Sequence, residues 1–161
     1  MSDQPALSYL QAAAQGASPI GQVILLYDTI LRDFARARGA LEAGDIAGRV
    51  NQLNHALTVI GHLESVLDYQ RGGEAARAFE RFYSVTRALI VEANGKATRE
   101  SLEQLARLYG QVRQAWYQAD QRLQVREIET TLSNSEGDAD GPRSNGHAKL
   151  ENETPPHYWK T

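Results

Sequence analysis

The residues best suited to acid–base or metal chemistry in this chain are His55, His62 and Glu64, which share one periodic stretch. The two histidines are seven residues apart and lie nearly on one face of a helix, whereas helical metal pairs are usually four apart. A helical two-metal site also needs Glu-x-x-His pairs on facing helices, and the sequence contains none. We therefore expect no enzymatic activity, no metal and no cofactor, and we expect His62 to be solvated.

Glu64 falls on the predicted apolar face of its helix, and Arg38 falls on the inner side of the preceding helix. Glu64 therefore either forms a structural ion pair with Arg38 or acts as an acid or base. The Gly72-Gly73 pair is not a phosphate loop, because the following Lys and Ser/Thr and a preceding strand are absent. Two glycines between helices suit the left-handed cap conformation.

The composition excludes several classes of protein. With 161 residues and a hydrophobic share of 42%, the chain suits one domain with a real core. It contains no cysteine, which fits a reducing compartment such as the cytoplasm. The N-terminus lacks the basic and apolar regions of a secretory signal, and no apolar run approaches ~18 residues. We therefore expect neither a signal peptide nor a membrane span.

The net negative charge of the chain is concentrated at its C-terminal end. Residues 127–161 carry seven acidic and three basic side chains, whereas the other 126 residues carry 13 acidic and 14 basic ones. A nearly neutral body argues against a nucleic-acid interface, which needs a concentrated basic face.

Four long segments repeat apolar residues at helical spacing and are separated by short breakers. Their spacing predicts helices over residues 19–43, 45–70, 74–93 and 98 to about 130, and no strand. Ser18 and Pro19 suit the N-cap and the first helical position. Because the connections are short, consecutive helices should be antiparallel neighbours. The predicted fold is all-α: an up-down four-helix bundle (17–130) with an N-terminal arm or short helix (1–16) and a disordered acidic tail (131–161).

Each predicted helix has one apolar face that should form the core. These faces comprise Ile20, Val23, Ile24, Tyr27, Ile30, Leu31 and Phe34; Ile46, Val50, Leu53, Leu57, Ile60 and Leu67; Ala75, Ala78, Phe79, Phe82, Val85, Thr86 and Leu89; and Leu102, Leu105, Tyr109, Val112, Trp116, Ala119 and Leu123. Further apolar residues flank these faces, namely Leu25, Leu26, Val59, Leu63, Val66, Tyr83, Ile90 and Leu108. The flanking residues either line grooves for an amphipathic partner helix or complete a wide core.

Several of these features resemble, in order and spacing, the FliS family of flagellar export chaperones. The resemblance covers about residues 7–120. It rests on Ala17-Ser18-Pro19 with Leu26-Tyr27-Asp28; Glu42-Ala43-Gly44-Asp45; Leu63 and Leu67-Asp68 before Gly72-Gly73-Glu74; Phe82-Tyr83, Leu89 and Glu92-Ala93-Asn94; and Val112-Arg113 with Ala115-Trp116.

The resemblance implies a cytosolic helical bundle that binds the disordered C-terminal segment of flagellin. Such a chaperone prevents early polymerisation and helps deliver flagellin to the type III export gate, whose components are a further expected partner. The flanking residues Leu25, Leu26, Val59, Leu63, Val66, Tyr83 and Ile90 would then contact the client. The residues Ser18, Pro19, Tyr27, Asp28, Gly72, Gly73 and Trp116 would have structural roles. We expect a monomer or weak dimer.

The family also has an N-terminal segment that can lie over a groove when flagellin is absent, and Tyr9 and Leu10 occupy that place here. The chain departs from the family in running about 40 residues beyond the usual end, a tail that contains Pro155-Pro156 before Tyr158-Trp159. An alternative function is therefore a helical adaptor or regulator that keeps the bundle but binds another partner, for instance through its tail.

Overall fold

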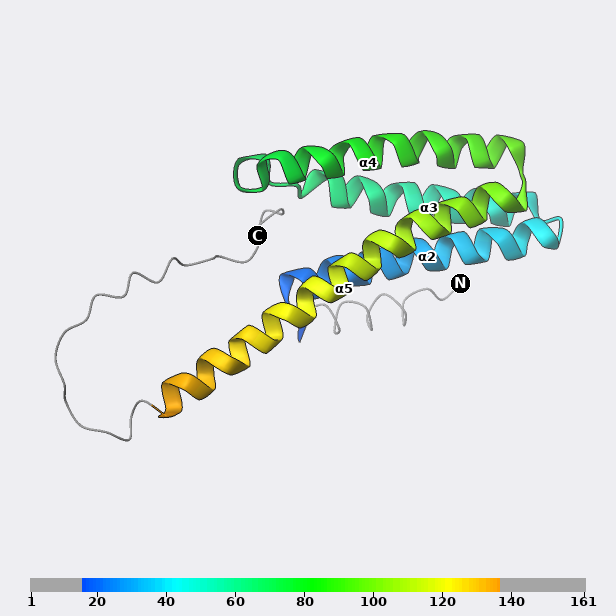
Figure 1. The fold of residues 1–161 in the computed structure, drawn as a ribbon. Helices are drawn as coiled ribbons and strands as arrows, with labels where there is room; N and C mark the ends of the chain where they lie inside the picture. The colour runs from blue at the N-terminus through cyan, green and yellow to red at the C-terminus, as the bar shows by residue number, and fades with distance from the viewer. Residues whose placement is uncertain (1–15, 137–161) are drawn as a thin grey trace.

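Four helices make up the part of the chain that the computed structural model describes, residues 16–136. They are α2 (Pro19–Glu42), α3 (Ile46–Ser65), α4 (Tyr69–Lys96) and α5 (Arg99–Glu136), and the described residues contain no strand. Consecutive helices run in opposite directions (Figure 1), which confirms the predicted all-α bundle. Residues 1–15 of the predicted arm (1–16), with Tyr9 and Leu10, and residues 137–161 of the predicted tail (131–161) lie outside the described residues.

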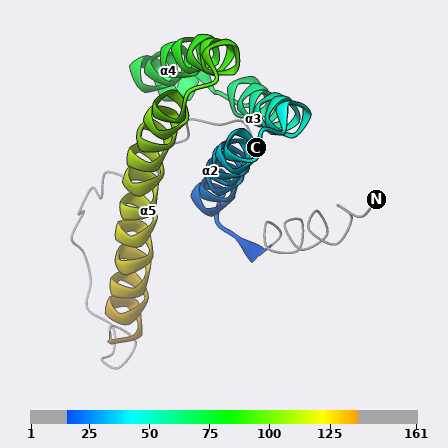
Figure 2. The same cartoon turned by 90° about the vertical axis from the view of Figure 1, so that its right-hand side faces the viewer.

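The helices form a closed ring in chain order. α2 packs against α3 and α5, and α4 packs against the same two helices, whereas the backbones of α2 and α4 do not approach closely. Helix α5 is much longer than the rest, and Figures 1 and 2 both show its C-terminal half extending beyond the other three.

The helix starts follow the capping residues in the sequence. The Ser18 hydroxyl accepts the Gly21 N–H at 2.9 Å, and Pro19 takes the first helical position, where its missing donor costs nothing. Asp45 accepts the Gly48 N–H at 2.8 Å in the same way at the start of α3. These local bonds explain why α2 and α3 begin where the sequence predicts.

The turn between α3 and α4 lies earlier than predicted. Helix α3 ends at Ser65 rather than near Gln70, because Asp68 caps α4 by accepting the N–H groups of Gln70 and Arg71, both at 3.1 Å. Gly73, with φ 48° and ψ −124°, interrupts the helical backbone inside α4, so the predicted break at the glycine pair is present, but it follows a first turn that Asp68 caps.

Two other helix ends also differ from the prediction. Helix α4 runs through Asn94 and Gly95 to Lys96, and the left-handed residue that closes it is Ala97 (φ 50°). Helix α5 continues beyond residue 130 to Glu136, and the hydroxyl groups of Thr131 and Ser133 donate to carbonyl groups one turn earlier, each at 2.8 Å.

The core contains most of the predicted faces of α2 and α5, but α4 is rotated. Tyr83 and Ile90, predicted to flank the face of α4, are fully buried, whereas Val85, predicted to be inside, is 60% exposed. On α3, Ile46 is 66% exposed while Leu63 is fully buried. Phe79, Phe82 and Leu89 remain partly buried against the core, so the buried face of α4 is broad.

Gly73→Ala tests the kink in α4. A side chain at φ 48° and ψ −124° is strained whatever space surrounds it, so the free energy of unfolding should fall by about 1–3 kcal/mol. Gly110→Ala in α5 is the matched control, because its added Cβ meets nothing within 4 Å and should stabilise the helix by about 0.5–1 kcal/mol. Urea denaturation measures both, and equal effects would contradict the assigned strain.

Candidate partner-binding surface

Three residues predicted to meet a partner are instead part of the core. Leu63, Tyr83 and Ile90 are 0% exposed, which corrects their expected position beside the core. Tyr83 is held inside because its hydroxyl group lies 2.9 Å from the Tyr27 hydroxyl group, and this contact rotates the whole face of α4 inward. The predicted residues Tyr9 and Leu10 lie outside the described range.

The other four predicted residues, Leu25, Leu26, Val59 and Val66, are half-buried on α2 and α3. Leu26 and Val59 pack against the core from its edge. The contact between Asp33 and His55 fixes the antiparallel register of α2 and α3, which places Leu26 level with residues 59–66 of α3. Leu26, Val59 and Val66 thus follow the outer edge of one helix junction, which we call the α2–α3 seam. Leu25 lies on the outward face of α2, beside this seam.

A buried carboxylate marks the same junction. Asp33 is 2% exposed, and its carboxylate lies 2.7 Å from Nδ1 of the half-exposed His55. Burial raises the pKa of Asp33 above its ordinary value of 3.8, and the hydrogen bond from His55 opposes that rise. The sequence contained a signal for this pair: Asp33 lies at helical spacing from Ile30 and Ala37, on the apolar face of α2.

The opposite junction, between α2 and α5, is held by charged contacts. Asp28 accepts a hydrogen bond from Nε of Arg113 at 2.9 Å, and the guanidinium of Arg113 lies over the Tyr117 ring. Near the start of α2, the Ser18 hydroxyl group donates to Asp120 at 2.8 Å. The hydrogen bond between Asp28 and Arg113 thus joins α2 to α5.

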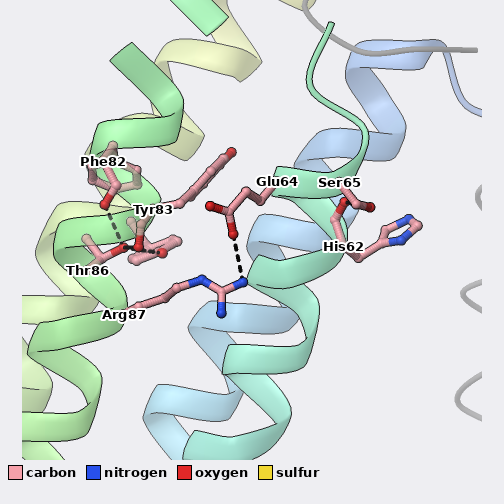
Figure 3. A network of polar contacts seen from close by, with 8 residues as sticks. His62, Glu64, Ser65, Phe82, Tyr83, Thr86 and Arg87 are labelled. Carbon is pink, nitrogen blue, oxygen red and sulfur yellow. Dashed lines mark hydrogen bonds and ion pairs between the residues drawn. The ribbon is translucent and has the colours of Figure 1, made fainter. Parts of the chain in front are cut away.

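Polar contacts join α4 to its neighbours, with an ion pair at the edge of the core and a hydroxyl contact inside it (Figure 3). Arg87 forms an ion pair with Glu64 at 2.8 Å, so the predicted partner of Glu64 was wrong; Arg38 instead approaches Glu103 at 3.9 Å. The Thr86 hydroxyl group donates to the Phe82 carbonyl at 2.9 Å and lies 2.7 Å from the Tyr109 hydroxyl group. In Figure 3, Arg87 lies on one side of Glu64 and His62 on the other. His62 is exposed, as predicted.

The buried phenols are held in their neutral form. Burial raises the pKa of Tyr27 from 10.0 to about 12, although hydrogen bonds from Tyr83 and Trp116 oppose that rise. Burial likewise raises the pKa of Tyr83 and of Tyr109, and the neighbouring Tyr27 adds to both increases. These groups are therefore structural hydrogen-bonding partners at neutral pH.

Two hollows can be described within residues 16–136. A cavity of about 80 Å³ between α4 and α5 has room for only a few water molecules. A shallow hollow of about 520 Å³ lies along α5 alone. Within the range 16–136, no group of three His, Asp or Glu residues is placed to hold a metal ion. The same range contains no helix that is both long and apolar enough to cross a membrane.

Tyr83→Phe tests the contact across the core. Removing one hydroxyl group leaves the Tyr27 hydroxyl buried without that partner, so stability should fall by about 1–2 kcal/mol. The double variant Tyr27→Phe/Tyr83→Phe removes both groups and should be more stable than the sum of the two single effects predicts. Chemical denaturation measures the cycle, and strictly additive effects would show that the hydroxyl groups are not coupled.

Alkaline pH provides a second test of the same tyrosines. Their folded pKa values lie above the unfolded value of 10.0, so their contribution to stability is complete below pH 10. It is lost as the pH rises above 10, because the unfolded chain releases phenolic protons that the fold retains. The melting temperature should fall between pH 10 and 11, and less so in the double Phe variant. An equal fall in both proteins would contradict this assignment.

Comparison with known proteins identifies the family. A family profile described as flagellar protein FliS matches residues 1–123, which include α2, α3, α4 and most of α5. The chain is 33% identical over 107 residues to the flagellar secretion chaperone FliSB of Pseudomonas aeruginosa, covering 66% of this chain and 85% of that protein. It is 27% identical over 119 residues to the flagellar secretion chaperone FliS of Salmonella typhimurium, an alignment that covers 73% of this chain and 88% of that protein. It is 29% identical over 109 residues to the flagellar secretion chaperone FliS of Campylobacter jejuni, an alignment that covers 68% of this chain and 85% of that protein.

These relatives are chaperones and not enzymes, which agrees with the prediction drawn from the absence of catalytic motifs. The match includes the capping residues of α2, the kinked start of α4 and the buried Trp116 of α5. The chain belongs to the FliS family of flagellar secretion chaperones.

Proposed function

We propose that this protein binds the disordered C-terminal segment of flagellin in the cytoplasm, prevents its early polymerisation and helps deliver it to the flagellar type III export apparatus. The observation that carries the proposal is the family match over residues 1–123, which include both helices of the α2–α3 seam. A component of the export gate is a further partner in this proposal.

The seam offers the kind of surface that such a client needs. A disordered segment that folds on binding loses about 2–5 kcal/mol to ordering, so it must bury apolar area in return. Leu26, Val59 and Val66 present half-buried apolar side chains along one junction, against which the apolar face of an amphipathic helix would pack. Because they are already partly covered, the free protein avoids a large exposed apolar patch.

Titration of the full chain with a peptide of its host's flagellin C-terminal segment tests the proposal. We expect micromolar or tighter binding, a gain in helical circular dichroism and a negative heat-capacity change, because the peptide would fold against apolar surface. Calorimetry and circular dichroism measure these quantities. If no binding appears at peptide concentrations of about 50 µM, the proposed client is wrong.

Val66→Asp tests the seam separately. Val66 follows α3 and is half-buried, so a carboxylate there should weaken peptide binding by about tenfold or more while the melting temperature changes little. Val85→Asp is the matched control, because Val85 is 60% exposed on α4. Equal binding by both variants would place the client elsewhere on the bundle without refuting flagellin binding.

A further inference from the structure

The C-terminal half of α5 carries an apolar stripe that no other described helix covers. Val125, Ile128 and Leu132 are 52%, 59% and 60% exposed. They follow one another at steps of three and four residues and so occupy one face of the helix. We call these three residues the α5 stripe.

The stripe lies outside both the bundle and the family match. The Ser18–Asp120 bond ties α5 to the start of α2, and Leu123 packs against the edge of the core; the stripe follows both along α5. Beyond this point α5 extends away from the other three helices in both views (Figures 1 and 2). The family profile ends at residue 123, so the stripe is a feature of this chain beyond the matched bundle.

The side chains beside the stripe show a pattern of charge. In heptad notation, Val125 and Leu132 are at position a, and Ile128 is at position d. Arg122 and Glu129 are then at two successive positions of type e. The g positions hold the uncharged Gln124 and Thr131. Neither Arg122 nor Glu129 forms an ion pair with another residue in the range 16–136.

This pattern is complementary to itself in one orientation only. In an antiparallel pair of identical helices, e positions face e positions, so Arg122 of each copy meets Glu129 of the other. Val125 then packs against Ile128 of the other copy. In a parallel pair, e positions would face the neutral g positions and form no ion pair.

We propose that the α5 stripe is a docking surface for a second copy of this chain, through an antiparallel pair of α5 helices related by a two-fold axis. The pairing covers about residues 118–136, so the two bundles lie at opposite ends and do not collide. Each copy contributes three apolar side chains and two flanking charges. The buried area is small, so the expected dimer is weak and forms reversibly.

Sedimentation velocity of the full chain over a range of about 10–500 µM tests the proposal. We expect a monomer–dimer equilibrium that shifts toward the monomer by about tenfold or more in Ile128→Glu, because the substitution places a carboxylate in the interface. Ile128 is 59% exposed, so the melting temperature should not change. Val85→Glu, at a residue 60% exposed on α4, should dimerise like the unaltered chain.

Charge reversal tests the orientation. Arg122→Glu and Glu129→Arg should each weaken the dimer, because each places like charges opposite one another. The double variant restores both opposite-charge pairs and should dimerise like the unaltered chain. An antiparallel interface is excluded if the double variant is as monomeric as either single variant.

Two other outcomes would overturn the proposal. A chain that stays monomeric throughout the concentration range, with or without Ile128→Glu, has no such interface. A full chain that dimerises only after Tyr158→Ser and Trp159→Ser would show that its own C-terminal aromatic residues occupy the stripe in place of a second copy. Neither outcome bears on flagellin binding, which the peptide titration measures separately.

Discussion

The need to satisfy hydroxyl groups inside an apolar core determines how this bundle is assembled. Tyr27 on α2 and Tyr83 on α4 meet across the diagonal of the ring, at 2.9 Å, although the backbones of these helices do not approach closely. An unpartnered buried hydroxyl group costs about 1–3 kcal/mol, so rotating α4 away from this contact is unfavourable. Once Tyr83 is inside, Ile90 must also be inside and Val85 must face solvent. The surface left for partners is therefore set by a polar contact in the core.

The contact between Tyr27 and Tyr83 also explains why some features of the bundle were predicted from the sequence and others were not. Helix number, the start of α2 at Ser18 and the buried face of α5 follow from caps and periodicity, which act within one helix. The rotation of α4 was mispredicted because its apolar residues surround much of the helix, and hydropathy does not reveal which hydroxyl groups will pair. The turn was misplaced because the chain has two breakers here: Asp68 caps the first turn of α4, and Gly73 interrupts the helix only after that turn.

These errors also changed the candidate site. Periodicity left Leu63, Tyr83 and Ile90 open to either a groove or the core, and the family resemblance favoured a groove; the structure places them in the core. Of the four residues still available, Leu26, Val59 and Val66 lie on a single junction and Leu25 lies beside it, so the candidate surface is smaller than predicted. The buried Asp33 beside them fixes the register of that junction through His55. A surface built on a fixed junction is preorganised, which lowers the ordering cost on the chaperone's side of a complex.

The seam and the α5 stripe lie on different parts of the ring. Helix α5 packs against α2 and α4, so α3, with its side of the seam, lies across the ring from it. The stripe lies farther along α5, in the half of the helix that follows the Ser18–Asp120 bond and extends beyond the other three helices (Figures 1 and 2). Occupying one surface therefore leaves the other accessible, and an antiparallel pair would display two seams at opposite ends of one particle. Two sites joined in this way raise the effective concentration of chaperone around a client or export component that carries more than one binding segment. A weak pairing suits such a task, because each copy can separate once its client has been transferred.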